Sequence, residues 1–191
     1  EQQDNFSISS LERAKKANEN GTFDDEIVPI KVINRKSEII INKDEQPFKA
    51  NIAKIPTLKA AFRKNGTVTA ANSSSISDGA SSVVLMKESE ANRRGLQPLA
   101  RIVTHSTNSQ EPKWFTTAPI GAIEKVLSKA GWSKSDVDLF EVNEAFAVVP
   151  MAVMKDLGVP HDIINIFGGA CALGHPVGAS GSRIVTTLIN A

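Results

Sequence analysis

Apolar β-branched runs alternate with helical patterns from residue 81 onward, and this alternation constrains the fold more than any other feature. The apolar runs predict strands at residues 81–86, 99–107 and 137–142. Patterns with the 3.6-residue helical period separate or follow them, and they cover residues 88–95, 118–131, 145–158 and 177–189. Strands that alternate with helices predict an α/β fold in which helices pack on a sheet.

The N-terminal part lacks this alternation and predicts a smaller, irregular lobe that ends near Ala71. A polar helical pattern covers residues 7–20. Two β-rich runs, 26–33 and 37–42, flank the turn-like sequence "NRKS". The chain opens inside a helical pattern and closes on an apolar run without a Gly or Pro stop. We therefore expect a segment of a longer protein.

Charge and cysteine content exclude several classes of protein. The formal net charge is +1 over 191 residues, which gives no electrostatic reason to expect binding to nucleic acid or to an anionic membrane surface. No apolar run approaches the roughly 20 residues of a membrane-spanning helix. A single cysteine cannot form an internal disulfide, which indicates a reducing compartment and favours a cytoplasmic location.

The stretch "FGGACALGHPVGASGSRI" at residues 167–184 holds the densest group of glycines in the chain. Gly174, Gly178 and Gly181 follow the pattern G-x-x-x-G-x-x-G, which is neither the dinucleotide fingerprint nor the P-loop. A phosphate-binding loop is one interpretation. Close approach of a helix to another part of the backbone is the other.

His175 and Cys171 are the reactive side chains of this stretch. His175 precedes Pro176, a residue suited to the first turn of a helix. The positive end of that helix would disfavour imidazolium and leave a neutral base; a structural loop histidine is the alternative. Cys171 lies four residues before His175, but the glycines make a shared helix unlikely, so we interpret Cys171 as a packing residue rather than a nucleophile.

Asn143 and Glu144 form a third candidate site, because they directly follow the predicted strand at 137–142. Open α/β sheets bind ligands at the carboxyl ends of their strands. The Asn143 amide could donate to an oxyanion or an ordered water. Alternatively, the pair forms a helix N-cap with a capping carboxylate. His105 and His161 are isolated, so the sequence predicts no metal site.

The motifs "VNEAFA" and "GGACALGHPVGASGSRI" together resemble those of the thiolase family. The resemblance extends to "GTVTAANSSSISDGASSVVLM", "PLARIV" and "FDDEIVPI", and so covers essentially the whole chain. It implies a layered fold of two similar α/β halves with an inserted loop domain that holds coenzyme A. Residues 1–75 would be the end of the loop domain, and residues 76–191 most of the C-terminal half.

The resemblance also implies a reaction, the reversible Claisen condensation of two acetyl-CoA molecules to acetoacetyl-CoA and CoA. The histidine of the GHP motif, here His175, would activate a nucleophilic cysteine. The asparagine of the NEAF motif, here Asn143, would hold a water that joins the histidine in an oxyanion hole. Both catalytic cysteines of the family fall outside this chain, so we expect the chain to be inactive alone. A longer-chain 3-ketoacyl-CoA thiolase and an inactive thiolase-like binding protein are the alternatives.

The resemblance further implies contacts with the substrate, and it implies no cofactor beyond the coenzyme A thioesters themselves. The resemblance also implies that the full-length protein is a homo-oligomer, either a dimer or a tetramer, and that it acts in lipid metabolism. Phe167 departs from the family, which usually has asparagine there. The positions that match substrate-contacting residues of the family are Ser74, Ala145 and Phe146 for the pantetheine arm, Phe115 for the acyl pocket, Phe62 for the adenine side and Lys49 for the phosphates.

Overall fold

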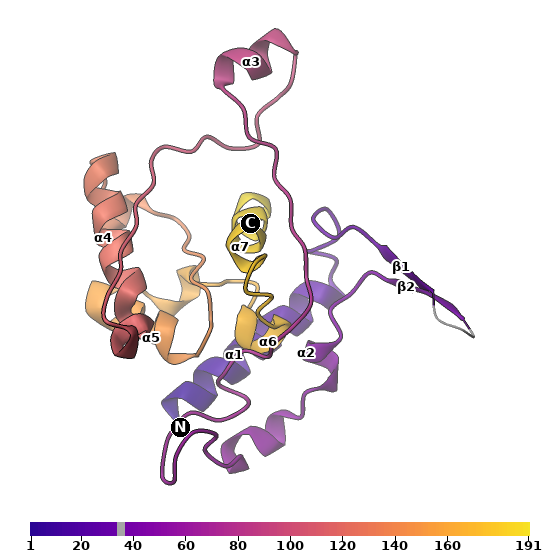
Figure 1. Ribbon diagram of the computed structural model, residues 1–191, viewed down its shortest axis with the longest axis vertical. Helices are drawn as coiled ribbons and strands as arrows, with labels where there is room; N and C mark the ends of the chain where they lie inside the picture. Colours follow the sequence, from indigo (N-terminus) through magenta and orange to yellow (C-terminus); the bar gives the residue numbers. More distant parts are fainter. Residues whose placement is uncertain (34–36) are drawn as a thin grey trace.

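Seven helices and one β-hairpin make up the regular structure of the described residues, 1–33 and 37–191, in this computed structural model. Figure 1 shows most helices gathered in the body of the molecule, with α3 and the hairpin projecting from it. The helices are α1 (Gln2–Glu19), α2 (Gln46–Lys49), α3 (Glu88–Arg93), α4 (Ala118–Ala130), α5 (Val148–Leu157), α6 (Ala170–Leu173) and α7 (Ser180–Asn190). Short 3₁₀ segments lie at Ile52–Thr57, Pro112–Thr117, Lys134–Asp136 and His161–Ile163.

The helices predicted from periodicity are confirmed, and a glycine caps the end of two of them. Gly131 follows α4 with a φ of 70°, and Gly158 follows α5 with a φ of 64°. This left-handed conformation is easy for glycine and costly for other residues, so the helical pattern stops there. Pro150 lies in the first turn of α5, where its missing N–H is tolerated. Helix α1 begins at Gln2, five residues before the predicted start.

The two β-rich runs of the N-terminal lobe pair as an antiparallel hairpin. Strand β1 (Ile30–Ile33) pairs with β2 (Glu38–Ile41), with Ile30 opposite Ile41 and Ile33 opposite Glu38. The first three residues of the predicted turn, 34–36, lie outside the described residues. Both strands are exposed along their whole length.

The strands predicted at 81–86 and 99–107 are wrong as paired elements. These segments run to α3 and back as long extended connections (Figure 1), and neither has a partner strand among the described residues. Val84 and Leu99 are 83% and 85% exposed. A β-branched pattern fits a strand, but a sheet also needs a neighbouring backbone to accept and donate the ladder hydrogen bonds.

The predicted strand at 137–142 pairs only briefly, in part through a side chain. Phe140 bridges Ile164, with Phe140 N donating to Ile163 O at 2.8 Å and Asn165 N donating to Phe140 O at 2.9 Å. One step further, Asn165 replaces a strand backbone. Its Oδ1 accepts from Val142 N at 2.7 Å, and its Nδ2 donates to Val142 O at 2.8 Å. The backbone N–H and C=O groups of Phe140 and Val142 are therefore hydrogen-bonded, although no regular β-ladder forms.

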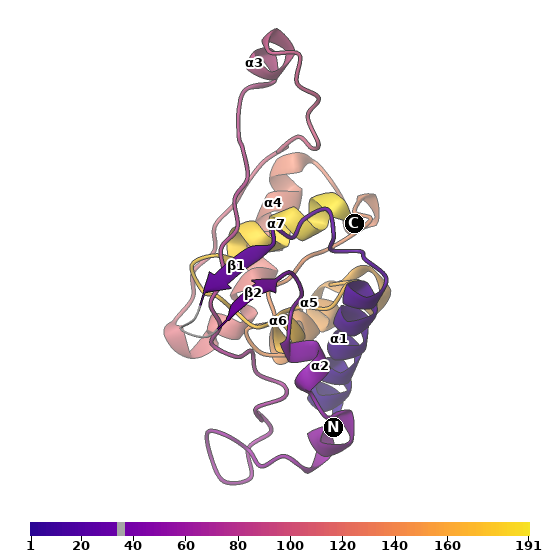
Figure 2. The same ribbon diagram turned by 90° about the vertical axis from the view of Figure 1, so that its right-hand side faces the viewer.

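Two apolar clusters hold the segments that carry the predicted site. The larger joins the 140–142 segment to α5 and the 157–164 connection, and its buried members are Phe140, Val142, Val149, Val153, Leu157, Val159 and Ile164. The smaller contains Leu11, Ala14, Ile55 and Ala172, so it joins α1 to α6. Helix α1 contacts α6 directly, and both views show them side by side (Figures 1 and 2). The residues after Val142 and the residues around α6 are thus fixed in one body.

Candidate active site

The structure brings Asn143 and His175 into contact, although 32 residues separate them. Asn143 Nδ2 lies 3.3 Å from His175 Nε2. Asn143 comes directly after the buried Val142, and His175 follows the turn that ends α6. An amide donor and an imidazole that meet in this way can act together on one oxygen atom.

The backbone and Ser180 fix the ring of His175. His175 N donates to Ser75 O at 2.9 Å, and the ring Nδ1 lies 2.6 Å from Ser180 Oγ. Ser180 Oγ donates its single proton to Pro176 O at 3.2 Å, so it accepts a hydrogen bond from Nδ1–H. In this tautomer Nε2 carries the lone pair and faces the Asn143 amide. The basic nitrogen of His175 is therefore the one aimed at the site.

The predicted helix start after His175 is displaced. Helix α7 begins at Ser180, four residues beyond Pro176. Pro176 opens the preceding turn, in which Ala179 N donates to Pro176 O at 2.8 Å. The ring of His175 is set by this turn and by Ser180, rather than by standing directly before the first residue of a helix.

Asn143 is not a helix N-cap, because α5 begins five residues later and its N-cap position is Ala147. The alternative interpretation of the NEAF motif as a capped helix start is therefore wrong. Asn143 Oδ1 is buried and has no hydrogen-bond partner among the described residues. A buried polar atom without a partner is uncommon in native proteins and is typical of functional sites.

Aromatic side chains form a wall beside the Asn143–His175 pair. The Phe146 ring meets Phe62 and Phe115 edge to face, with 6.0 Å between ring centroids in both pairs. Ser74 binds the same segment, since its backbone N and its Oγ donate to Ala145 O at 3.1 and 3.0 Å. A cavity of about 360 Å³ adjoins this wall. It is lined by Phe115, Pro119, Ala122, Ile123, Glu141, Val142, Asn143, Ala145, Val149 and Ile184.

Five of the six predicted substrate-contacting residues therefore gather near the Asn143–His175 pair. Lys49 makes no contact with them among the described residues. Lys49 Nζ pairs with the Glu45 carboxylate at 2.5 Å on an exposed part of α2. Surface ion pairs of this kind contribute little to stability and exchange partners easily.

Cys171 has the environment of a packing residue. It is 7% exposed and clusters with Phe6 and Ala147. Burial raises the pKa of its thiol far above the ordinary value, and the nearby Glu144 carboxylate raises it further. The thiolate is the nucleophilic form of cysteine, so the raised pKa disfavours attack by this sulfur. Gly174, with a φ of 89°, ends α6 before His175, so the two residues do not share a helix.

The sequence offered Glu144 no role of its own beyond that of a possible capping carboxylate. Its side chain is fully buried, and its carboxylate accepts hydrogen bonds from Ser10 Oγ at 2.7 Å, Asn165 Nδ2 at 2.9 Å and Cys171 N at 3.1 Å. Burial raises the pKa of this carboxyl, while the Asn165, Ser10 and Cys171 donors and the positive charge of Arg183 oppose the rise. The sequence pattern pointed to a functional role for the neighbouring Asn143. No local pattern indicated that Ser10, Asn165 and Cys171 N would bind Glu144.

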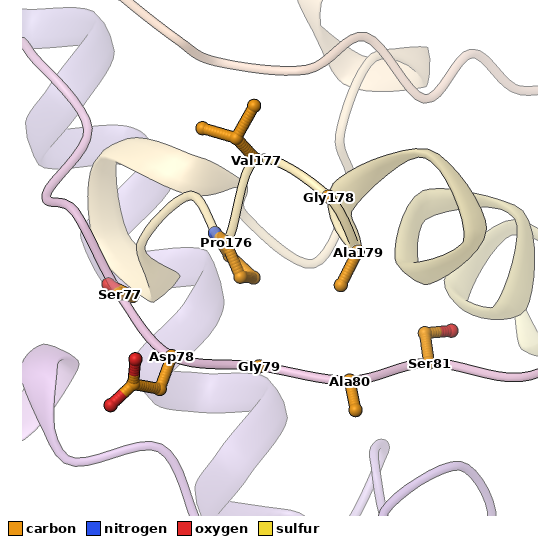
Figure 3. A pocket seen from close by; sticks show the side chains of 9 residues that line it. All are labelled: Ser77, Asp78, Gly79, Ala80, Ser81, Pro176, Val177, Gly178 and Ala179. Atoms are coloured by element: carbon orange, nitrogen blue, oxygen red, sulfur yellow. The ribbon is translucent and has the colours of Figure 1, made fainter.

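The glycine-rich stretch is closely packed at Gly174, where a Cβ would clash with Ser77 Oγ, whereas a Cβ on Gly178 or Gly181 would meet nothing within 4 Å. A second close approach involves Gly79, outside the stretch. Figure 3 shows residues 77–81 running alongside the Pro176–Ala179 turn, with the Pro176 ring pointing toward them and Val177 pointing away. A Cβ on Gly79 would come within 2.6 Å of Pro176 Cγ, so only glycine permits this approach. The hollow between the two segments has a volume of about 420 Å³. Phe167 stands where the family usually has asparagine. Its ring meets Phe23 edge to face, with 6.2 Å between the ring centroids, so the substituted residue makes an apolar contact.

Glu141 is a second acidic group with an unusual environment, and it lines the 360 Å³ cavity. Its side chain is 5% exposed, and its Oε2 has no hydrogen-bond partner among the described residues. Burial raises the pKa of Glu141 to about 7; Arg183, 3.9 Å away, lowers it, and the negative charges of Glu144 and Glu26 raise it. Folding therefore favours the protonated acid.

Glu141→Gln should make stability less dependent on pH. Between pH 4.5 and about 7 the folded protein holds a proton that the unfolded chain has lost, so the wild-type stability falls as pH rises through this window. The neutral amide does not titrate, so we expect the variant to be more stable at pH 8 by about 3 kcal/mol, from 1.36 kcal/mol per pKa unit. The advantage should vanish below pH 4.5. Urea unfolding at both pH values measures it, with the exposed Glu38→Gln as control; an equal difference at both values contradicts the assignment.

The described residues contain no group of three or more His, Cys, Asp or Glu side chains placed to hold a metal ion. Within the same residues, none of the helices has the length and apolar character that crossing a membrane requires.

Two family models match the chain, and between them they cover most of it. The model "Thiolase, N-terminal domain" matches residues 1–89, and "Thiolase, C-terminal domain" matches residues 96–191. The domain division that we placed between residues 75 and 76 stays a prediction.

Relatives agree with these models. A probable acetyl-CoA acetyltransferase of Dictyostelium discoideum is 53% identical over 98% of this chain and 46% of its own length. The cytosolic acetyl-CoA acetyltransferase of Mus musculus is 50% identical over 100% of this chain and 49% of its own length. The crystal structure of the Bacillus anthracis acetyl-CoA acetyltransferase superposes with a TM-score of 0.95 at 46% identity, over 98% of this chain and 48% of that one. This chain thus spans about half the length of the relatives it matches, and the expected α/β class is confirmed. The chain belongs to the thiolase family.

Proposed function

We propose that the whole protein is an acetyl-CoA acetyltransferase that interconverts two acetyl-CoA molecules with acetoacetyl-CoA and CoA. The observation that carries this proposal is the contact between the Asn143 amide and His175 Nε2 beside the aromatic wall. The substrate would be a coenzyme A thioester, and we propose no further cofactor.

The chemistry of the pair supports this reaction. Claisen condensation passes through a thioester enolate, whose negative oxygen needs positioned hydrogen-bond donors. Asn143 Nδ2 is a permanent donor toward that oxygen, directly or through a bound water. His175 Nε2, whose lone pair faces the Asn143 amide, can take the proton of a cysteine thiol and then donate it as imidazolium. The catalytic cysteines would come from parts of the whole protein beyond this chain.

The surrounding residues support a thioester as the ligand. Phe146, Phe62 and Phe115 offer an apolar surface to the acyl and pantetheine portions, and the Ser74–Ala145 contact holds the edge of that surface. Lys49 is the cation that we propose for the phosphates. It would exchange its exposed Glu45 partner for them.

Thiolysis across a chain-length series tests the proposal. The whole protein is given acetoacetyl-CoA and 3-ketoacyl-CoA substrates with six to sixteen acyl carbons. One extra methylene in an apolar pocket changes transition-state binding by about 1–3 kcal/mol. We therefore expect the highest kcat/KM with acetoacetyl-CoA. A preference for long chains would identify a 3-ketoacyl-CoA thiolase instead. Binding of thioesters without turnover would identify the inactive, binding form of the family.

We further propose a cytoplasmic homotetramer that acts in lipid metabolism. A cytosolic mouse relative and the single, buried cysteine support the location. The exposed hairpin and extended segments offer apolar surface for association. Light scattering on the purified whole protein measures its subunit number, and a monomer contradicts the proposal.

A further inference from the structure

We propose that Glu144 is a positioning residue, whose buried carboxylate sets the Asn143 amide against the His175 imidazole. The inference rests on the proposed role of that pair, and it deepens it by naming the group that fixes its geometry. Asn143 and Ala145 both face the site, the first through its contact with His175 and the second beside Ser74. Glu144, between them, points the opposite way into the interior, where it is 0% exposed.

The carboxylate joins three segments that are far apart in the chain. Ser10 reaches it from α1, Asn165 from the connection before α6, and Cys171 N from the first turn of α6. The Ser10 hydroxyl also accepts from Gly169 N at 2.9 Å, so it bridges the carboxylate to the residue that opens α6. Glu144 therefore ties the backbone that carries Asn143 directly to the helical turn that leads to His175.

The neighbouring backbone is shaped around this side chain. A Cβ built on Gly169 would lie 2.4 Å from Glu144 Cδ, so the carboxyl group occupies the space that any other residue would need. Only one residue, Gly174, separates the end of α6 from His175. A shift of α6 relative to Glu144 is thus transmitted to the imidazole through a very short connection.

The hydrogen-bond pattern requires two acceptor oxygens, which a glutamine cannot supply. Asn165 is locked, because its amide is already paired with Val142 N and O, so its Nδ2 must face Glu144. Cys171 N–H is likewise a fixed donor. If the new side chain of Glu144→Gln turned its oxygen toward Asn165, its amide nitrogen would oppose Cys171 N. With the reverse orientation it would oppose Asn165 Nδ2. Either way a buried donor faces a donor, which displaces one of the two segments.

Two readouts on Glu144→Gln test this inference. In the whole protein, kcat and KM for acetoacetyl-CoA thiolysis are measured, and we expect kcat to fall about 100-fold while KM stays nearly constant, the effect expected for a misplaced transition-state donor. In the whole protein, without substrate, NMR follows the cross-peak between the Asn143 side-chain amide and the His175 ring. We expect this cross-peak to weaken or disappear.

Two further variants separate positioning from general destabilisation. Ser10→Ala removes the bridge to Gly169 while leaving Glu144 in place, and it should give an intermediate loss in both readouts; it also serves if Glu144→Gln does not fold. Leu157→Ala opens a cavity in the core at the far end of α5, and it should lower stability while keeping the cross-peak and kcat.

The outcomes are distinct. A persistent cross-peak in folded Glu144→Gln and Ser10→Ala overturns the inference, as does a loss of kcat no greater than that of Leu157→Ala. If the whole protein lacks thiolase activity but the cross-peak is still lost selectively, the proposed function fails and the positioning role stands.

Discussion

Replacing His175 with alanine in the whole protein is expected to lower kcat for acetoacetyl-CoA thiolysis by about 10²–10⁴-fold, the usual contribution of a general base. The structure gives the physical reason. His175 Nε2 carries the lone pair and faces the Asn143 amide, because Ser180 accepts the hydrogen bond from Nδ1–H. Alanine removes the base that generates a thiolate and also one of the two donors at the oxyanion position.

The fold should survive this change, because the backbone of His175, rather than its ring, donates to Ser75 O. Steady-state kinetics and the circular dichroism spectrum of the same sample measure both expectations. The exposed His105 provides a matched control, and His105→Ala should leave kcat unchanged. A folded His175→Ala variant with less than about a tenfold loss would contradict the assignment.

Cys171 in the native chain should react with iodoacetamide on the order of 1,000-fold more slowly than a free thiol, because little thiolate exists at neutral pH and the sulfur is buried. Burial raises the pKa of this thiol, and the Glu144 charge raises it further. Mass spectrometry of the alkylated chain measures the rate. The same chain in urea supplies the control, since unfolding should restore the ordinary rate.

The same argument predicts that the 191-residue chain alone shows no thiolytic turnover, since Cys171 is its one cysteine. Cys171→Ser in the whole protein should keep nearly full activity. Rapid native alkylation that tracks loss of activity would show that Cys171 is chemically involved after all.

Local sequence signals were sufficient to predict the helices, and the family resemblance was sufficient to single out Asn143 and His175 as a candidate pair. The period of α4, its proline start and the stop at Gly131 all act within a few residues, so they are visible in the sequence. The paired NEAF and GHP motifs indicated Asn143 and His175 through the family resemblance, and the structure then placed them in contact.

Features that depend on distant partners could not be predicted. The runs at 81–86 and 99–107 have strand-like sequences, but pairing depends on a neighbouring backbone that a local pattern does not specify. The Glu144 carboxylate is fixed by Ser10, 134 residues away in the sequence, and by a backbone N–H that has no sequence signature at all. The resemblance named Phe62, Phe115 and Phe146, but their edge-to-face ring contacts join positions far apart in the chain and had no local signal.

Asn165, whose side chain stands in for a strand next to Val142, has a consequence for sequence variation. Its amide oxygen accepts a hydrogen bond from Val142 N, while its Nδ2 donates one to Val142 O. The same Nδ2 donates a second hydrogen bond to the Glu144 carboxylate. Its φ of 47° lies in the left-handed region, which asparagine tolerates better than most residues. Aspartate lacks the donor, glutamine is one methylene too long, and glycine has the backbone freedom but no amide. Position 165 is therefore restricted to a single side chain by stereochemistry and hydrogen bonding together, although this side chain is buried in the interior.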